Sequence, residues 1–119
     1  MRDIECVDDK ELELLMGAGT KVIDIRTPAE WQERGIIKGS IKLMFFDADG
    51  SYDFEKWIEE LQKYVKSKDD TFVLVCAHAN RTKVVGNFLR DKLGYKNVVE
   101  LCGGIEYGWI LKGRETVEA

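Results

Sequence analysis

Apolar residues occur along this chain in two alternating patterns, short continuous runs and stripes at helical spacing. The segments 22–25, 72–75 and 98–101 are short, rich in Val, Ile and Leu, and predict strands that are covered on both faces. The segment 40–43 alternates polar and apolar residues, which is typical of a strand nearer the edge of a sheet. A further strand candidate near the start of the chain contains Cys6.

Helices are predicted between these strands. Thr27 and Pro28 form a capping residue followed by a proline at the first helical position, so a helix is expected from there to about Arg34. Gly94 is expected to stop another helix at its carboxyl end. The predicted helical segments are 9–16, 28–34, 54–65, 84–93 and a short one around 105–111.

The regular alternation of strand and helix predicts an α/β fold, with a parallel sheet, helices on both faces and right-handed crossovers. The 119 residues match the usual size of one compact domain, and 45% of them are hydrophobic, enough for one core. We therefore expect a single domain over 1–119, with its core at about 3–113 and a short polar tail.

The charge balance argues against two classes of partner. A formal net charge of -4 gives no general attraction to phosphate backbones or to anionic lipid surfaces, which require clustered Lys and Arg. No apolar run is long enough to indicate a membrane span or an export signal. Neither nucleic acid nor a membrane is expected to bind this chain.

The three cysteines are widely spaced. They stand at positions 6, 76 and 102 without a Cys-x-x-Cys pair, so the spacing indicates neither a disulfide framework nor a zinc site. We expect free thiols, a reducing cytoplasmic setting and no metal. Cys6 is expected to fill the core. Cys102 stands before two glycines, where it is either a small residue of a tight turn or a resolving thiol.

Cys76 directly follows the predicted strand 72–75, and a helix begins within about six residues. Ligands of open α/β sheets bind beyond the carboxyl ends of the strands, where the next helices present their N-termini. If residues 77–82 curl around the sulfur, their N–H groups form an anion-binding nest that favours the thiolate. Such a thiolate can attack a sulfane sulfur and carry it as a persulfide without metal or organic cofactor.

Three separated stretches of this chain resemble the rhodanese-like domains. The first is Val22-Ile23-Asp24-Ile25-Arg26-Thr27-Pro28-Ala29-Glu30-Trp31 with Gly35-Ile36-Ile37-Lys38-Gly39-Ser40-Ile41, the second is Cys76 to Thr82, and the third is Leu101-Cys102-Gly103-Gly104-Ile105-Glu106-Tyr107-Gly108-Trp109. They occur in family order and cover about 20–113.

The resemblance implies a three-layer fold with a five-stranded parallel sheet and a six-residue active loop that begins at the persulfide-forming cysteine, here Cys76. It also implies that the transferred sulfur is bound by the loop amides, those of Ala77, His78, Ala79, Asn80, Arg81 and Thr82. In similar domains the residues at Asp24 and Arg26 brace the site. The implied activity is transfer of sulfane sulfur from thiosulfate or a persulfide, carried on a small molecule or a protein, to a thiol or cyanide.

Two positions depart from the family pattern. Ala79 occupies a place where the family often has glycine, and Ile36 a place where it often has histidine. If residue 79 needs a positive φ, Ala costs on the order of 1 kcal/mol relative to Gly. Ala77 contributes no cation at the second loop position, which predicts poor use of thiosulfate. His78 is open to three interpretations: a base, a hydrogen-bond donor to the sulfur donor, or a surface residue.

Two other functions compete with sulfur transfer. Cysteine-dependent phosphatases and related arsenate reductases place arginine after five intervening residues, whereas Arg81 follows Cys76 after four. The shorter loop argues against phosphoryl chemistry. The second alternative is a protein-binding module that keeps the fold without catalysis; the retained Cys76 argues against it.

Overall fold

The strands form one fully parallel sheet in the computed structural model, which describes residues 2–119. Their order across the sheet is β1-β5-β4-β2-β3. The central strand β4 pairs with its neighbour β2 along their whole length, with Ile23 opposite Leu74 and Asp24 opposite Val75. The strands are β1 (Cys6–Val7), β2 (Lys21–Asp24), β3 (Ile41–Lys42), β4 (Phe72–Val75) and β5 (Val98–Leu101).

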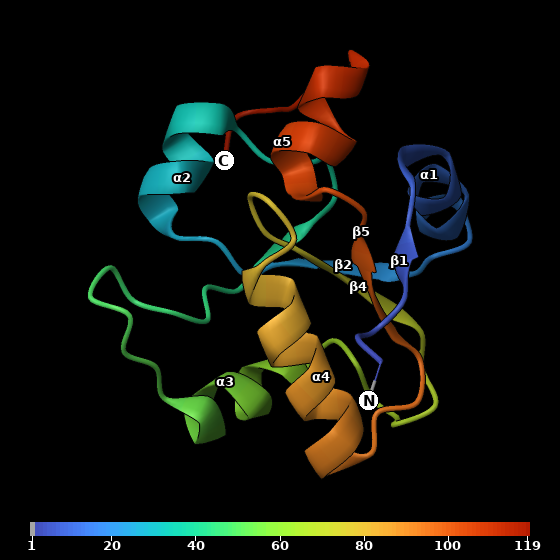
Figure 1. Ribbon diagram of the computed structural model, residues 1–119, viewed down its shortest axis with the longest axis vertical. Coiled ribbons are helices and arrows are strands. Elements are labelled where there is room, and N and C mark those ends of the chain that lie inside the picture. The colour runs from blue at the N-terminus through green and yellow to red at the C-terminus, as the bar shows by residue number, and fades with distance from the viewer. Residues whose placement is uncertain (1) are drawn as a thin grey trace.

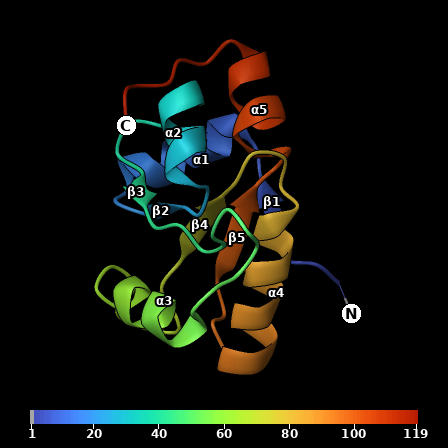
Figure 2. The ribbon, with the colours of Figure 1, turned by 90° about the vertical axis from the view of Figure 1, so that its left-hand side faces the viewer.

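Helices cover both faces of this sheet (Figure 2). One face carries α1 (Asp9–Gly17), α2 (Pro28–Arg34) and α5 (Gly104–Gly108), which is followed by a 3₁₀ turn (Ile110–Lys112). The other carries α3 (Phe54–Leu61) and α4 (Arg81–Leu93) (Figures 1 and 2). The predicted α/β three-layer architecture with a five-stranded parallel sheet is confirmed. Within the described part, no helix is long and apolar enough to cross a membrane.

Alternating residues of the central strands divide the core into two layers. Ile23 and Leu74 pack in the layer that includes Leu61 of α3 and Leu89 of α4. Their strand neighbours Val22 and Val73 pack in the opposite layer, with Leu12 of α1 and Ile105 of α5. This two-sided burial explains the continuous apolar runs of β2 and β4, because both faces of a parallel sheet are covered.

Local signals set most helix boundaries. In α2, the Thr27 hydroxyl accepts from the Glu30 N–H while the Glu30 carboxylate accepts from the Thr27 N–H, a complete capping box with Pro28 at the start. The last residue of α4 is followed by Gly94, whose φ of 77° lies in the left-handed region. The helix expected over 54–65 ends earlier, at Leu61, although Val65 remains buried.

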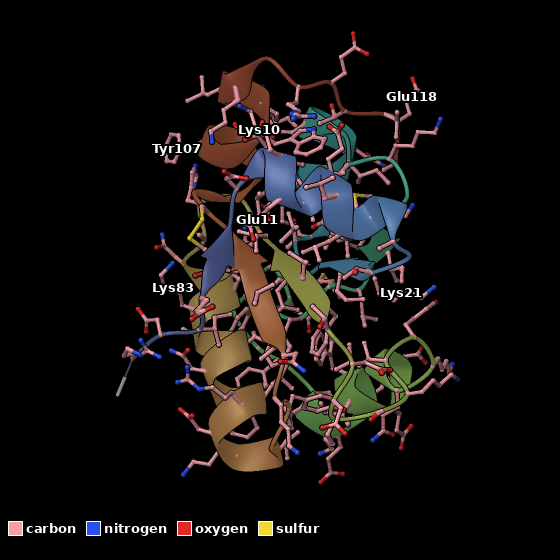
Figure 3. The ribbon with its side chains drawn as sticks, turned by 90° about the vertical axis from the view of Figure 1, so that its right-hand side faces the viewer. Lys10, Glu11, Lys21, Lys83, Tyr107 and Glu118 are labelled. Atoms are coloured by element: carbon pink, nitrogen blue, oxygen red, sulfur yellow. A yellow bond between two sulfur atoms is a disulfide. The ribbon has the colours of Figure 1, made fainter. Side chains whose placement is uncertain are left out.

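The expectation of three free thiols is wrong for two of the cysteines. Cys6 and Cys102 form a disulfide bond, with Cα atoms 4.9 Å apart (yellow in Figure 3). Val7 of β1 pairs with Leu101 of β5, and Cys102, the residue after Leu101, therefore lies beside β1. The two cysteines are 96 residues apart in the sequence, so their spacing gives no sign of this contact. Cys6 is exposed rather than core filling, and Cys102 lies in a turn as a bonded half-cystine rather than a free resolving thiol.

Candidate active site

Cys76 follows β4 directly and is the free cysteine of the chain, with 1% of its surface exposed. Because β4 lies in the middle of the sheet, between β5 and β2, side chains from both neighbours meet at its carboxyl end. The loop from Cys76 to Asn80 leads into α4, which begins at Arg81 (Figure 1). This is the switch from strand to helix that the sequence predicted.

The loop has a sharply turned backbone. Ala79 has φ = 64°, so this position does adopt the positive φ at which alanine is less favourable than glycine. Its side chain is buried. Among residues 2–119, no carbonyl or side chain accepts a hydrogen bond from the N–H groups of 77–82. Six consecutive donors therefore stand free for an anion next to the thiol and the start of α4.

The start of α5 holds the loop from the side. The Ile105 N–H donates to the carbonyl of Cys76 at 2.9 Å, and the Glu106 N–H donates to the carbonyl of Ala77 at 3.1 Å. Gly104 makes this approach possible, since a Cβ there would lie 2.3 Å from the Ala77 carbonyl oxygen and its φ is +69°. Gly104 of the Leu101–Trp109 segment therefore lets the start of α5 pack directly against the backbone of the loop.

Asp24 and Arg26 form a buried ion pair at the end of β2, each 1% exposed. Arg26 donates to both Asp24 carboxylate oxygens, from Nε at 3.0 Å to Oδ1 and from Nη2 at 2.8 Å to Oδ2. The same guanidinium donates to the Gly35 carbonyl at 2.7 Å, where α2 ends. The pair therefore ties the carboxyl end of α2 to the end of β2, and its role in bracing the site stays a prediction.

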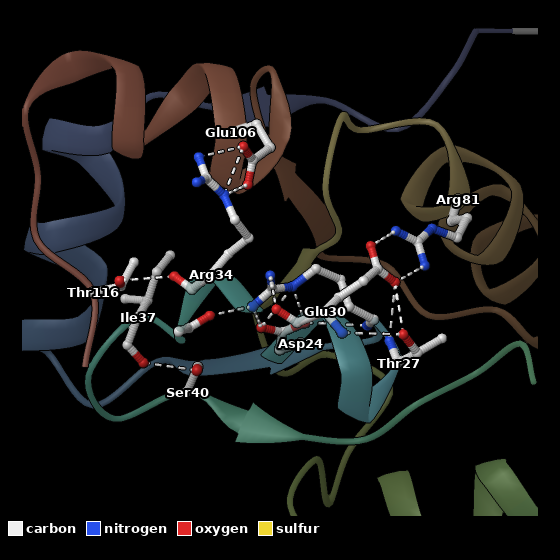
Figure 4. A network of polar contacts seen from close by, with 11 residues as sticks. Asp24, Thr27, Glu30, Arg34, Ile37, Ser40, Arg81, Glu106 and Thr116 are labelled. Carbon is white, nitrogen blue, oxygen red and sulfur yellow. Dashed lines mark hydrogen bonds and ion pairs between the residues drawn. The ribbon is translucent and has the colours of Figure 1, made fainter. Parts of the chain in front are cut away.

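Arg81 is held by a bidentate ion pair with Glu30 of α2, both N–O distances being 2.7 Å (Figure 4). The hydrogen bond from Arg81, with smaller help from Thr27, lowers the pKa of Glu30 to about 2. The same pairing raises the pKa of Arg81, so this guanidinium stays charged but is largely neutralised by its partner. At the rim of the site, Arg34 is likewise paired with Glu106 at 2.8 Å (Figure 4).

His78 and Asn80 are exposed, whereas the Cys76 thiol between the same strand and helix is buried. His78 is exposed, and its ring lies against that of Tyr107, with centroids 5.0 Å apart. Asn80 is exposed and does not cap α4 with its side chain. A shallow hollow of about 340 Å³ lies above this part of the loop, bounded by Arg26, Glu30, Glu33, Arg34, Ala77, His78 and Glu106.

Sequence reasoning missed a buried polar network behind Cys76. The Cys76 Sγ lies 3.5 Å from the Thr82 hydroxyl, which donates to Glu100 at 2.5 Å. Glu100, on β5, is 1% exposed and is paired with Lys83 at 2.7 Å. The sequence feature that could have indicated this network is Glu100 itself, an acidic residue inside an otherwise apolar strand. Buried carboxylates are rare unless they are paired. Among residues 2–119, no cluster of His, Cys, Asp and Glu is arranged to hold a metal ion.

The fold and the loop together match one known family. The model of the rhodanese-like domain matches residues 8–110, and the chain belongs to this family. None of the curated proteins compared with this chain matches it.

Solved structures with the same fold include a rhodanese-related protein from Thermoplasma volcanium. It is 29% identical, and the match covers 95% of this chain and 97% of that one, with a TM-score of 0.65. A polysulfide-sulfur transferase homodimer from Wolinella succinogenes is 21% identical over 98% of this chain and 80% of its own, with a TM-score of 0.72. A Rhodopseudomonas palustris protein described as a possible tyrosine phosphatase is 24% identical over 96% and 85%, with a TM-score of 0.67.

Proposed function

We propose that this rhodanese-like domain is a sulfurtransferase that carries sulfane sulfur on Cys76. The observation that carries the proposal is the free thiol at the end of β4, next to six N–H groups for which residues 2–119 offer no acceptor. These donors suit the terminal sulfur of a persulfide, which is anionic at neutral pH, as well as an anionic donor.

Two displacement steps complete the proposed cycle. The Cys76 thiolate attacks the sulfane sulfur of a donor, the bond between that sulfur and the donor breaks, and the donor leaves as a thiolate or as sulfite. An acceptor thiolate or cyanide then attacks the outer sulfur, and the sulfur–sulfur bond to Cys76 breaks with return of its thiolate. Both steps balance without an oxidant, a metal or an organic cofactor.

The charges at the rim favour a persulfide or polysulfide donor over thiosulfate. The three arginines nearest the loop, Arg26, Arg34 and Arg81, are each paired with a carboxylate, so little uncompensated positive charge attracts a dianion. Ala77 adds none. The Wolinella succinogenes structure is described as a polysulfide-sulfur transferase, which agrees with this choice of donor.

A cysteine-dependent phosphatase is the second candidate, because one structural neighbour is described as a possible tyrosine phosphatase. Such an enzyme needs its loop arginine to bind the phosphoryl oxygens. Here Arg81 follows Cys76 after four residues and both of its terminal nitrogens donate to Glu30. The loop is therefore better suited to a single sulfur than to a tetrahedral anion.

The test is intact-mass measurement after incubation with polysulfide, with thiosulfate and with a small-molecule persulfide, followed by mapping of the modified residue. We expect a gain of one sulfur on Cys76, reversed by cyanide, and no gain in the Cys76→Ser variant. Hydrolysis of phosphate esters without any sulfur gain would favour the phosphatase. If the protein does neither, a protein-binding module without catalysis is the better explanation.

A further inference from the structure

Glu100 is a buried carboxylate with no part in the displacement steps above. It lies on β5, two positions from Cys102 and opposite Leu74 of β4, and only 1% of its side chain is exposed. One of its oxygens accepts from the Thr82 hydroxyl at 2.5 Å and the other accepts from Lys83 Nζ at 2.7 Å. A charge placed here costs desolvation energy, so a purely apolar side chain would be the simpler core residue.

The direction of the hydrogen bonds in this network follows from counting protons. An ionised carboxylate only accepts, so the single Thr82 hydroxyl proton points to Glu100. The Thr82 oxygen is then an acceptor, and the neighbouring group able to donate to it is the Cys76 thiol at 3.5 Å. The resting arrangement is a chain from S–H to O–H to carboxylate.

We propose that Thr82 and Glu100 form a proton relay that takes the thiol proton of Cys76 as the sulfur attacks its donor. The thiol proton moves to the Thr82 oxygen while the Thr82 hydroxyl proton moves to Glu100. The products are a Cys76 sulfur free to attack, a Thr82 hydroxyl that now donates to that sulfur, and a neutral Glu100. The inference rests on the proposed function for its reaction, although the relay acts in any attack by Cys76.

Lys83 completes the relay. Its ammonium forms an ion pair with the Glu100 carboxylate and also donates to the carbonyl of Ala79 at 3.0 Å, which links the relay to the turned part of the loop. The other charged groups facing the thiol are the Arg81–Glu30 pair and, at the end of β2, the Asp24–Arg26 pair. Both pairs are internally compensated, so Glu100 is the acceptor connected to the thiol by hydrogen bonds.

The relay offers Cys76 a second route of attack beside the ordinary one. In the ordinary route a thiol first releases its proton to solvent, so the rate falls about tenfold for each pH unit below the thiol pKa. In the relay route the proton passes through Thr82 to Glu100 during the attack, and no free thiolate is needed. The relay route therefore contributes most at low pH and little once the thiol is ionised.

The pH dependence of Cys76 alkylation by iodoacetamide tests the relay without requiring sulfur transfer. At about pH 9, where an ordinary thiol is largely ionised, the parent, Thr82→Val and Glu100→Gln should react at similar rates. At about pH 6 the parent should react at least about tenfold faster than either variant, because free thiolate is scarce there and the relay adds a second route. Thr82→Ser keeps the hydroxyl and should react like the parent at both pH values.

Two further measurements separate the relay from a bracing role. Glu100→Gln combined with Lys83→Met removes both charges of the buried pair and should stay slow at about pH 6, provided thermal melting shows a folded protein. A parent-to-variant rate ratio that is the same at both pH values, or equal rates for Thr82→Val and Thr82→Ser, would overturn the relay. A ratio that rises at low pH without any sulfur loading would instead leave the relay standing and overturn the sulfurtransferase proposal.

Discussion

Arg81 of the loop and Glu30 of α2 clamp the two sides of the candidate active site although they lie 51 residues apart in the sequence. Two parallel N–O contacts of 2.7 Å make the pair a planar fork, with both side chains less than one-third exposed. Glu30 also belongs to the capping box of α2, so the position of that helix and the charge of the loop depend on the same carboxylate.

Neutralising Glu30 should change the preference for sulfur donors. Glu30→Gln retains a side chain that caps α2 but leaves the Arg81 cation uncompensated. One charge at about 4 Å in a solvated setting changes the interaction by about 1 kcal/mol, so thiosulfate use should rise about fivefold. The measurement is kcat/KM for thiosulfate and for a neutral organic polysulfide, and the polysulfide value should change little.

Glu33→Gln is the matched control for this variant. Glu33 is on the same helix, and among residues 2–119 it has no ion-pair partner within contact distance. Arg81→Ala should lower thiosulfate use in the parent, and adding it to Glu30→Gln should abolish the gain. An equal gain in Glu33→Gln would show that net charge, rather than the Arg81–Glu30 pair, decides the effect.

The same ion pair predicts how stability depends on acidity. The folded pKa of Glu30 is about 2, below its ordinary value of 4.5, because Arg81 hydrogen-bonds the charged form. A lowered folded pKa stabilises the protein fully above the ordinary value, and this contribution is lost as pH falls from about 4.5 to 2. Urea unfolding of the parent and of Glu30→Gln should show a stability difference at pH 6 that shrinks across this window. A difference that stays constant down to pH 2 would contradict the assignment.

The left-handed backbone at Ala79 predicts unequal effects of two substitutions. Ala79→Gly relieves about 1–2 kcal/mol of strain but loses about 0.4–1 kcal/mol to unfolded-chain entropy and some methyl burial, so stability should change by less than about 1 kcal/mol. Ala79→Val should destabilise by about 1–3 kcal/mol, because a β-branched residue fits this region poorly. Ala77→Val, outside the left-handed region, is the control in urea unfolding, and an equal loss there would argue against backbone strain.

The disulfide bond should contribute much of the stability of the fold. It joins residues separated by 96 positions, and a disulfide bond typically stabilises a protein by about 2–4 kcal/mol. Reduction of the parent, or replacement of both Cys6 and Cys102 by Ser, should lower the free energy of unfolding by this amount. The reductant should have no effect on the double variant, and a parent midpoint unchanged by reduction would refute the prediction.

Sequence patterns predicted those parts of the fold that depend on local interactions. The apolar runs predicted β2, β4 and β5, and Thr27 with Pro28 predicted the start of α2, because capping and burial act over a few residues. The position of Cys76 between a strand and a helix followed from the same patterns. The family resemblance supplied the number of strands.

Pairings between distant segments could not be predicted in this way. The partners of Arg81, Thr82 and Cys102 are Glu30, Glu100 and Cys6, and each meets its partner only after the sheet order is formed. A carboxylate in a strand signals that some partner exists without naming it. A cysteine beside two glycines predicts a turn, and this prediction is the same whether or not another cysteine is close enough to form a disulfide.

Under the proposed function, the disulfide also bears on the fate of the sulfur that Cys76 carries. Of the three cysteines in the chain, Cys6 and Cys102 are bonded to each other and Cys76 remains. Among these three cysteines, a proposed persulfide on Cys76 would meet no second free thiol that could attack it and expel the outer atom as hydrogen sulfide. Its lifetime would then be decided by which external nucleophile reaches the loop, so the oxidised pair would act as a safeguard against futile discharge.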